Sequence, residues 1–242
     1  MRARRPREEV TVVLSPGERR ERNREEMRRA ILDAARAVMR EQGVAALSLR
    51  EVARRVKMQA PSLYAYFPNK MALYDGLFAD GIRTFLSYRN AADYEPGNFR
   101  EALRAKIEAY MQFASEHPEL YQLCFERPVP GFVPSAASME ATLAGVAQFE
   151  GEMADMIATG EISPGLSARQ ARDLTIAMMH GLTSQHMANE PHMPVGSGRY
   201  GGLIEAAVAL FDAAWGTGTR SDVSTDERAR QQSSGDGKEV DG

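Results

Sequence analysis

The chain has 242 residues, of which 43% are hydrophobic and 26% charged, and its formal net charge is −3 at pH 7. This balance is typical of a globular protein with one or two domains and a buried core. No segment approaches the roughly 20 apolar residues that span a bilayer, and the Arg-rich start lacks the apolar core of a secretion signal. A single cysteine, Cys124, excludes an internal disulfide and a multi-cysteine zinc site, and we expect it in the core of a cytoplasmic protein with no membrane contact.

The charge is divided unevenly along the chain. Residues 1–70 hold 17 Lys and Arg against 9 Asp and Glu, a net charge of +8, whereas residues 71–242 hold 13 against 24, a net charge of −11. A basic N-terminal part attracts phosphate, while an acidic remainder discourages nonspecific coating of DNA.

Both ends of the chain have the composition of flexible segments. Residues 1–20 are predicted to form a basic arm, with arginines at Arg2, Arg4, Arg5 and Arg7. Such an arm is either a solvated tail or a segment that adds phosphate and minor-groove contacts beside a recognition helix. Residues 217–242 are rich in Ser, Gly, Asp and Arg and are predicted to be disordered.

Two helices are predicted before residue 57. The first has its apolar stripe at Met27, Ile31, Ala34, Ala35 and Val38 and ends at Gly43. A second helix begins at Ser48, which forms a capping box with Glu51. Its buried face is predicted at Leu49, Val52, Ala53 and Val56, and its opposite face carries Arg50, Arg54 and Arg55.

A third helix is predicted from Pro61 to Phe67, because proline suits a first helical turn and Pro68 ends the segment. Asn69 is a good N-cap for a fourth helix, at whose entry Lys70 stands. A lysine there opposes the helix dipole, so a shared anion such as a DNA phosphate explains it better. Residues 48–70 therefore predict a helix-turn-helix that binds DNA, although a basic helix pair alone is also typical of a solvated surface.

This stretch, with residues 27–47 before it, resembles the N-terminal domain of TetR-family transcriptional regulators. The family's Leu-Tyr-x-x-Phe-x-x-Lys pattern stands here as Leu63, Tyr64, Phe67 and Lys70, followed by Leu73. The resemblance implies that residues 21–70 form a DNA-binding domain in which the first helix packs across the helix pair.

Two positions depart from that pattern. The chain has Lys57 where the family commonly has a turn glycine, and Gln59 where it commonly has Ser or Thr. Lysine takes a positive φ angle less readily than glycine, and Gln59 is a weaker N-cap than serine. Gln59 is instead a candidate base reader, because glutamine pairs bidentately with adenine. We assign phosphate contacts to Ser48, Arg50, Tyr64 and Lys70, and base contacts to Gln59, Ala60, Ser62 and Tyr66.

The rest of the chain also reads as helical, so the fold class is all-α. A fourth helix carries Tyr74, Phe78, Ile82 and Phe85. A fifth begins near Phe99 and ends near His117 and Pro118. Further helices are expected at about 118–127, 136–160, 168–187 and 199–216, with a break at residues 128–135. Residues 71–216 form a C-terminal domain for effector binding and dimerisation, as the resemblance implies, with the fourth helix connecting the two domains.

The last two helices are predicted to form a dimer interface. Residues 199–216 carry one apolar stripe at Ile204, Val208, Phe211 and Trp215 and a second at Leu203, Ala207, Leu210 and Ala214. A helix with so wide an apolar arc buries two faces, one of them against a partner chain. Small residues at Ala171, Ala177 and Gly181 allow close helix approach. We assign Ala171, Ala177, Gly181, Ile204, Val208, Phe211 and Trp215 to a four-helix interface between two copies, as the resemblance implies.

The C-terminal segments at residues 117–128 and 178–182 also resemble a TetR-type C-terminal domain, which implies an effector cavity among the fifth to eighth helices. Its candidate lining is apolar and adaptable: Tyr110, Phe113, Tyr121, Met153, Met156, Met178 and Met179. A solid core explains the same pattern, and for any single residue it is the preferred interpretation. His180 and His186 lie on different faces of their helix, so we expect no metal site and no cofactor.

These patterns together predict a dimeric regulator that binds a near-palindromic operator, most simply a repressor released by a small molecule. Activation is the other possibility, because whether a bound regulator represses or activates depends on where the operator lies relative to the promoter. The alternatives are a helical protein-interaction module without DNA binding, and an enzyme. The sequence has no Gly-rich phosphate loop, nucleophile elbow or paired metal motif, which disfavours an enzyme.

Overall fold

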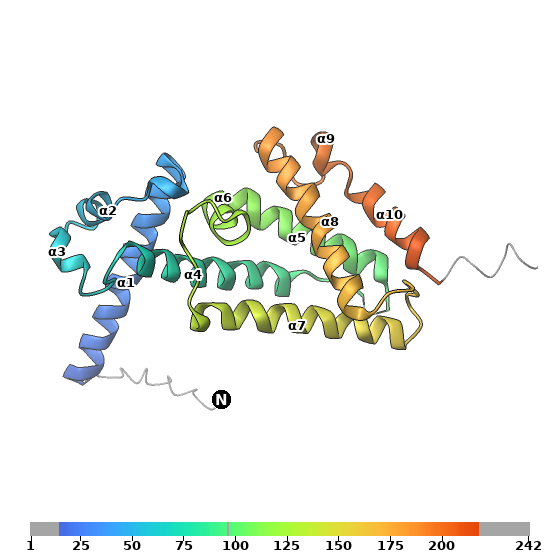
Figure 1. Cartoon of the computed structure of the whole chain (residues 1–242), viewed down its shortest axis with the longest axis horizontal. Coiled ribbons are helices and arrows are strands. Elements are labelled where there is room, and N and C mark those ends of the chain that lie inside the picture. Colours follow the sequence, from blue (N-terminus) through green and yellow to red (C-terminus); the bar gives the residue numbers. More distant parts are fainter. Residues whose placement is uncertain (1–14, 96, 218–242) are drawn as a thin grey trace, which may run out of the picture. The chain divides into compact units, whose positions relative to one another are not determined.

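In a computed structural model of the chain, residues 15–95 and 97–217 are described. The predicted arm at residues 1–14 and the predicted tail at 218–242 lie outside these residues. The regular structure of the described part is helical, apart from one isolated bridge between Ile162 and Gly216, so the all-α prediction is confirmed (Figure 1). The chain divides into two compact units, the first ending at Leu77 and the second beginning at Phe78. No helix in residues 15–95 and 97–217 has the length and hydropathy needed to cross a bilayer.

Helix α1 (Pro16–Gln42) begins earlier than the sequence pattern predicted. Its N-cap is Ser15, whose backbone N–H donates to Glu18 Oε2 at 2.7 Å while its hydroxyl accepts the Glu18 N–H at 3.3 Å. Residues 16–26 of this helix are exposed, so they carry no apolar stripe that periodicity can detect. Residues 16–20, predicted as part of a flexible arm, are therefore helical.

The first unit packs around the second half of α1, where Ile31, Ala35, Val38 and Met39 are buried. This face contacts a 3₁₀ turn (Val44–Ala46) and α2 (Leu49–Arg55), and α2 in turn contacts α3 (Ala60–Leu63). Helix α4 (Lys70–Ala91) starts here, and its Tyr74 hydroxyl donates to the Val44 carbonyl at 2.6 Å. The helix pair is therefore held between α1 and the start of α4.

The second unit contains the end of α4, α5 (Phe99–Glu116), α6 (Pro118–Tyr121), a π turn (Gln122–Glu126), α7 (Ala136–Ala158) and α8 (Ala168–Asn189). It ends with α9 (Gly198–Gly201) and α10 (Ile204–Trp215). Helix α8 packs against α5, α7 and α9, and α10 packs against α5 (Figure 1). Most of the predicted helices of this unit are present, and the loop at residues 128–135 breaks the chain as expected.

The last predicted helix, at residues 199–216, is divided into α9 and α10. The chain turns at Gly202, where an added Cβ would lie 2.6 Å from the Gly198 carbonyl oxygen. Thr217, predicted to belong to the disordered tail, donates its hydroxyl hydrogen to the Gly160 carbonyl at 2.7 Å. A hydrogen bond from the Ser163 N–H to the Trp215 carbonyl at 2.7 Å also ties the end of α10 to the α7–α8 loop.

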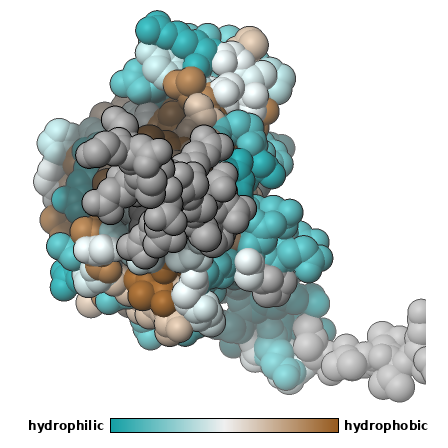
Figure 2. All heavy atoms as spheres, turned by 90° about the vertical axis from the view of Figure 1, so that its right-hand side faces the viewer, coloured by the Kyte–Doolittle hydropathy of each residue, from teal (hydrophilic) through white to brown (hydrophobic). Residues whose placement is uncertain are grey.

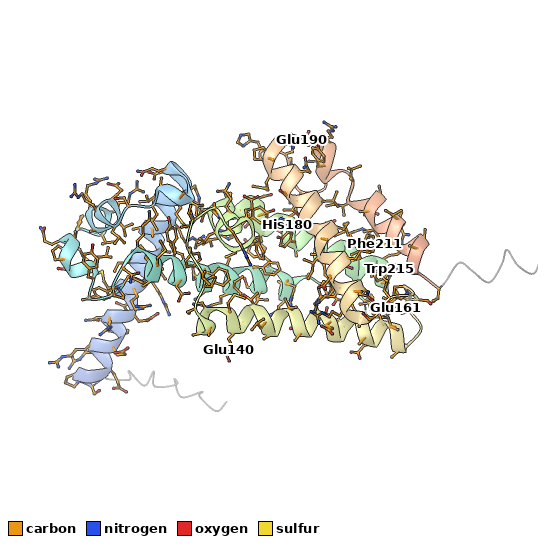
Figure 3. All side chains as sticks on the ribbon, viewed as in Figure 1. Glu140, Glu161, His180, Glu190, Phe211 and Trp215 are labelled. Atoms are coloured by element: carbon orange, nitrogen blue, oxygen red, sulfur yellow. The ribbon has the colours of Figure 1, made fainter. Side chains whose placement is uncertain are left out.

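The α10 stripe predicted to form part of a dimer interface is buried within the chain itself, so the prediction is wrong for these residues. Phe211 and Trp215 pack on each other at 4.6 Å between ring centroids, and Trp215 lies 6.2 Å from Phe99 of α5 (Figure 3). The buried residues of the assignment are Ala171, Ile204, Val208, Phe211 and Trp215.

The exposed apolar face of these helices is a different one. On α8, Leu174 is 48% exposed and is followed on the same face by the exposed Ala177 and Gly181. Leu203, the N-cap residue of α10, is 43% exposed, and Leu210 within α10 is 68% exposed. The view in Figure 2 shows brown apolar patches bordered by hydrophilic side chains. The second stripe of the sequence pattern is thus the one left at the surface.

Candidate nucleic-acid interface and internal cavity

The turn between α2 and α3 is a Schellman motif, in which the chain closes the helix end with two backbone hydrogen bonds. The Met58 N–H donates to the Ala53 carbonyl at 2.9 Å, and the Lys57 N–H donates to the Arg54 carbonyl at 3.2 Å. This motif places Lys57 in the left-handed region, with φ of 55°. The structure therefore holds a lysine in the conformation that a glycine adopts at least cost.

Helix α3 is shorter than predicted, since it ends at Leu63 and is followed by a turn over residues 64–66. Leu63 and Phe67 are buried and anchor this segment in the first unit. Arg28 of α1 also stabilises the turn that follows α3. Its Nη1 donates to the Tyr66 carbonyl at 2.8 Å, and its guanidinium lies 4.5 Å from the Phe67 ring centroid.

The outward side of α3 and its turn carries two of the predicted base-contact residues, Gln59 and Ser62, and one predicted phosphate contact, Tyr64. Gln59, Ser62 and Tyr64 are exposed, and Tyr64 is 51% exposed despite its large ring. Ala60 and Tyr66 are half-buried. Gln59 is the N-cap residue of α3 but makes no side-chain cap hydrogen bond, so its amide is available to another partner.

The cationic face of α2 is smaller than the sequence suggested. Arg54 and Arg55 both donate to Glu51, and Arg55 also donates to Glu41 at 2.5 and 2.9 Å. These hydrogen bonds lower the pKa of Glu51 to about 2, with Arg54 the largest cause. Arg50 and Lys57 are exposed and have no carboxylate partner among residues 15–95 and 97–217.

Ser48 and Lys70, the first and last of the predicted phosphate-binding residues, have hydrogen-bond partners within the chain. The Ser48 hydroxyl accepts the Glu51 N–H at 3.5 Å, but the Glu51 carboxylate turns to the arginines, so only half of the predicted capping box forms. Asn69 caps α4 as predicted, since its Oδ1 accepts the Ala72 N–H at 2.8 Å. Lys70 donates to the Ala45 carbonyl at 3.3 Å, which uses one of its three donors.

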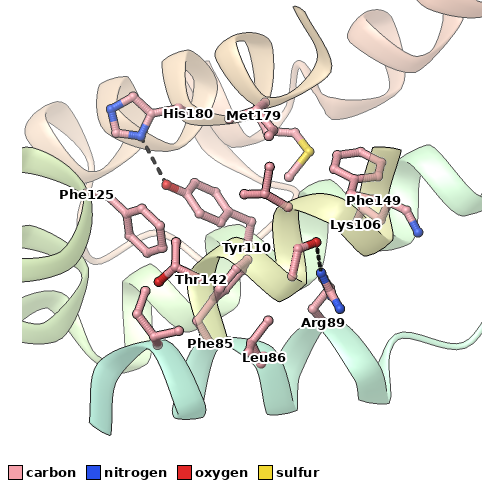
Figure 4. A pocket seen from close by; sticks show the side chains of 14 residues that line it. Phe85, Leu86, Arg89, Lys106, Tyr110, Phe125, Thr142, Phe149, Met179 and His180 are labelled. Atoms are coloured by element: carbon pink, nitrogen blue, oxygen red, sulfur yellow. Dashed lines mark hydrogen bonds between the residues drawn. The ribbon is translucent and has the colours of Figure 1, made fainter. Parts of the chain in front are cut away.

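The second unit has a partly open cavity of about 300 Å³ between α4, α5, α7 and α8, with Phe125 of the π turn on its wall (Figure 4). Most of its lining is apolar. The residues that line it are Ile82, Phe85, Leu86, Arg89, Lys106, Tyr110, Phe125, Thr142, Gly145, Val146, Phe149, Ile176, Met179 and His180.

Five polar side chains interrupt this apolar wall: Arg89, Lys106, Tyr110, Thr142 and His180. The Tyr110 hydroxyl lies 3.1 Å from His180 Nδ1, and burial is the chief cause that raises the Tyr110 pKa. Lys106 is neutralised by Glu152 at 3.0 Å and also donates to the Tyr94 hydroxyl at 2.9 Å. Arg89 donates to the Gly145 carbonyl at 2.8 Å. Figure 4 places Arg89 and Lys106 toward one end of the cavity and His180 and Phe125 toward the other.

Of the seven residues predicted to line an effector site, Tyr110 and Met179 line this cavity. Phe113, Tyr121 and Met153 are instead buried core residues, while Met156 and Met178 are half-buried outside its lining. Helical spacing identified the inward faces of α5, α7 and α8, but spacing does not reveal where those faces leave a void. Arg89 and His180 line the cavity and were not assigned to it from the sequence.

A helix pair joined by a tight turn, with exposed polar side chains on its second helix, defines a helix-turn-helix DNA-binding protein. The comparisons with known proteins agree. Residues 31–77 match the family described as "Bacterial regulatory proteins, tetR family", and residues 103–217 match "Tetracyclin repressor-like, C-terminal domain". The two matches cover roughly two thirds of the chain, and the protein belongs to the TetR family of DNA-binding transcriptional regulators.

Of two similar proteins, one is named as a transcriptional activator and the other as a transcriptional repressor. The chain is 31% identical over 103 residues to the HTH-type transcriptional activator FasR of Mycolicibacterium smegmatis, a match that covers 43% of this chain and 47% of FasR. It is 34% identical over 106 residues to the HTH-type transcriptional repressor DrrR1 of Streptomyces coeruleorubidus, covering 44% of this chain and 37% of DrrR1. The matches thus span less than half the length of each relative, and both relatives are regulators, not enzymes.

The fold is also shared with solved structures. The transcriptional regulator FadR from Bacillus subtilis, in complex with stearoyl-CoA, matches with a TM-score of 0.61 and 18% identity. The match covers 77% of this chain and 98% of FadR. At this identity the likeness concerns the fold alone.

Proposed function

We propose that the protein is a dimeric repressor that binds a near-palindromic operator and releases it when a small molecule enters the cavity. The observation that carries this proposal is the presence, in one chain, of an exposed recognition segment and a separate apolar cavity of about 300 Å³. A regulator needs both, because it reads DNA with one part and senses a ligand with another. Such a role places the protein in the cytoplasm with the DNA.

At the DNA, Arg50, Lys57 and Tyr64 contact phosphates, while Gln59 and Ser62 read base edges. This division follows exposure and charge, since the two cations lack carboxylate partners in the described chain and the two polar side chains lie on the outward side of α3. Ser48 and Lys70 contact phosphate at the margins of the same surface, and Ala60 and Tyr66 add apolar contact. Two recognition helices about 34 to 36 Å apart would match successive turns of B-DNA.

Helix α4 is the physical route proposed for release. It begins beside the recognition segment, and four cavity residues, Ile82, Phe85, Leu86 and Arg89, belong to its second half. A ligand that binds one position of α4 more tightly shifts the protein toward that position. The complex of FadR with stearoyl-CoA is a precedent for a ligand in this fold.

The test is a binding titration on the DNA that flanks the protein's own coding region, at two salt concentrations. We expect saturable binding to one near-palindromic fragment, weakened by Arg50→Gln and Tyr64→Ala. Arg50→Gln removes one cationic phosphate contact from each subunit of the dimer, and each lost contact should reduce the slope of log affinity against log salt by about 0.9. The matched control is Arg169→Gln, which removes an exposed arginine of α8 and should leave both the affinity and the slope unchanged.

Two results would count against the proposal. If no fragment is preferred there or in a genome-wide selection of sites, the protein does not act through an operator, and a protein-interaction module becomes the better account. If Arg50→Gln and Arg169→Gln weaken binding equally, attraction is a diffuse charge effect and not a contact at the helix-turn-helix.

A further inference from the structure

Two cationic side chains line the cavity, and only one of them is paired with a carboxylate in the described part of the chain. Lys106 is paired with Glu152, and its charge also faces the Tyr94 and Phe149 rings at 4.5 and 5.6 Å. Arg89 has a different environment, because its partners are all neutral: the Gly145 carbonyl and the side chains of Gln148 and Asn90. Among residues 15–95 and 97–217 no carboxylate pairs with Arg89, so the cavity wall carries one uncompensated positive charge.

The guanidinium also keeps donor capacity. Arginine has five N–H donors, and the structure gives Arg89 four hydrogen bonds, of which those to Asn90 are long at 3.3 and 3.4 Å. Gln148 and Asn90 are exposed and can bond to water instead. A ligand oxygen can therefore take the unused donor and replace a weak bond without leaving a buried group unpaired.

The backbone of α7 is shaped to receive this side chain. Gly145 stands in the middle of a long helix, where glycine is unfavourable by roughly 1 kcal/mol relative to alanine. A Cβ at this position would lie 3.3 Å from Arg89 Nη1 and 3.0 Å from Leu86 Cδ2. The absence of that Cβ lets the guanidinium reach the Gly145 carbonyl at the edge of the cavity.

We infer that the cavity binds an amphipathic organic anion, with its acidic head at Arg89 and its apolar body along the wall toward Phe125 and His180. This inference rests on the proposed function, whose effector site it specifies. A carboxylate or phosphate head neutralises Arg89 by a charge-assisted hydrogen bond. A neutral ligand leaves that charge uncompensated, and a cationic ligand meets like charge.

The volume of the cavity suits a small apolar body. At about 300 Å³ it lies at the lower end of the range for ligand pockets, roughly 300 to 1,000 Å³. A medium-length acyl chain or a small aromatic ring system fills it. The opposite end offers the Tyr110 and His180 pair to a second polar group of the ligand, if it has one.

The test measures ligand binding to the full chain by calorimetry at pH 8, without DNA, using decanoate, 1-decanol and decylamine. These probes share one chain and differ in charge. We expect decanoate to bind about tenfold more tightly than 1-decanol, and decylamine to bind least. We also expect 1-decanol to displace decanoate, because both occupy the same apolar wall.

Variants assign the preference to one residue. Arg89→Gln should bind decanoate and 1-decanol alike, whereas Arg89→Lys should keep part of the preference for decanoate because it keeps the charge. Arg83→Gln removes an exposed arginine from the same helix, six residues earlier, and should leave the preference unchanged. The ratio of two affinities within each variant corrects for any loss of folded protein.

Three outcomes would overturn the inference: no saturable binding of decanoate, equal binding of decanoate and 1-decanol by the wild type, or a preference that survives in Arg89→Gln. The result is separable from that of the operator titration. A protein that binds an operator but not decanoate retains the proposed function and loses this inference. If the protein binds decanoate but no operator, this inference about the cavity ligand holds and the proposed function as an operator-binding repressor fails.

Discussion

At the residue scale, two features of the helix-turn-helix are unusual: a backbone conformation and an ion-pair arrangement. Lys57 has a left-handed backbone, and Arg54 and Arg55 share one acid, Glu51. The sequence predicted the first of these, because a lysine stands where the family commonly has a glycine. It did not predict the second, since the direction in which Glu51 turns depends on Glu41 reaching Arg55 from α1.

Replacing Lys57 should separate stability from DNA binding. Lys57→Gly relieves the left-handed strain and is expected to stabilise the protein by roughly 1 kcal/mol in urea unfolding. Lys57→Ala removes the same charge but retains the positive φ, so it should give no such gain. Both variants should bind DNA more weakly than the wild type. A stabilisation shared equally by the two variants would show that backbone strain is not its cause.

Glu51 predicts a pH dependence. Its pKa is lowered from 4.5 to about 2 by hydrogen bonds from Arg54 and Arg55. Because the folded pKa lies below the unfolded one, this contribution to stability is complete above about pH 5 and is lost as the pH falls toward 2. Urea unfolding measured across this window should show a smaller loss for Glu51→Gln than for the wild type. Parallel curves for the two proteins would contradict this assignment.

At the scale of elements, sequence periodicity and capping signals located most helices, and the failures have physical reasons. Residues 16–26 of α1 are exposed on all sides, so only the pairing of Ser15 with Glu18 marked the true start. The α10 stripes were both found, but which one faces inward depends on Phe99 and the rest of α5. The cavity could not be predicted, because whether inward side chains meet each other or leave a void is a property of the assembled helices.

The contact between α4 and the π turn depends on a glycine. A Cβ at Gly81 would lie 2.6 Å from Cys124 Sγ, and burial raises the pKa of that thiol. Gly81→Ala should therefore destabilise the wild type by about 1 to 3 kcal/mol through overpacking. In a Cys124→Ala background the sulfur is absent, so the same change should be neutral or stabilising. Additive effects in urea unfolding would mean that the two side-chain positions do not compete for space.

At the scale of the whole molecule, the exposed apolar face of α8 and α10 is expected to pair with a second copy. Leu210 is 68% exposed on α10, so Leu210→Lys should convert a dimer into monomers in sedimentation experiments without unfolding the chain. The control is Leu143→Lys on α7, where Leu143 is 62% exposed. A wild type that is monomeric at micromolar concentration, or a dimer that tolerates Leu210→Lys, would remove this face as the interface.

In the proposed function, one molecule couples DNA binding to ligand binding. The most direct measurement is the affinity of the protein for its preferred DNA fragment, by fluorescence anisotropy, with and without saturating decanoate. A coupling of the usual size predicts that decanoate weakens operator binding by about 5- to 150-fold, while Arg89→Gln responds much less. An operator affinity that stays the same while calorimetry shows decanoate bound in the cavity would contradict the claim.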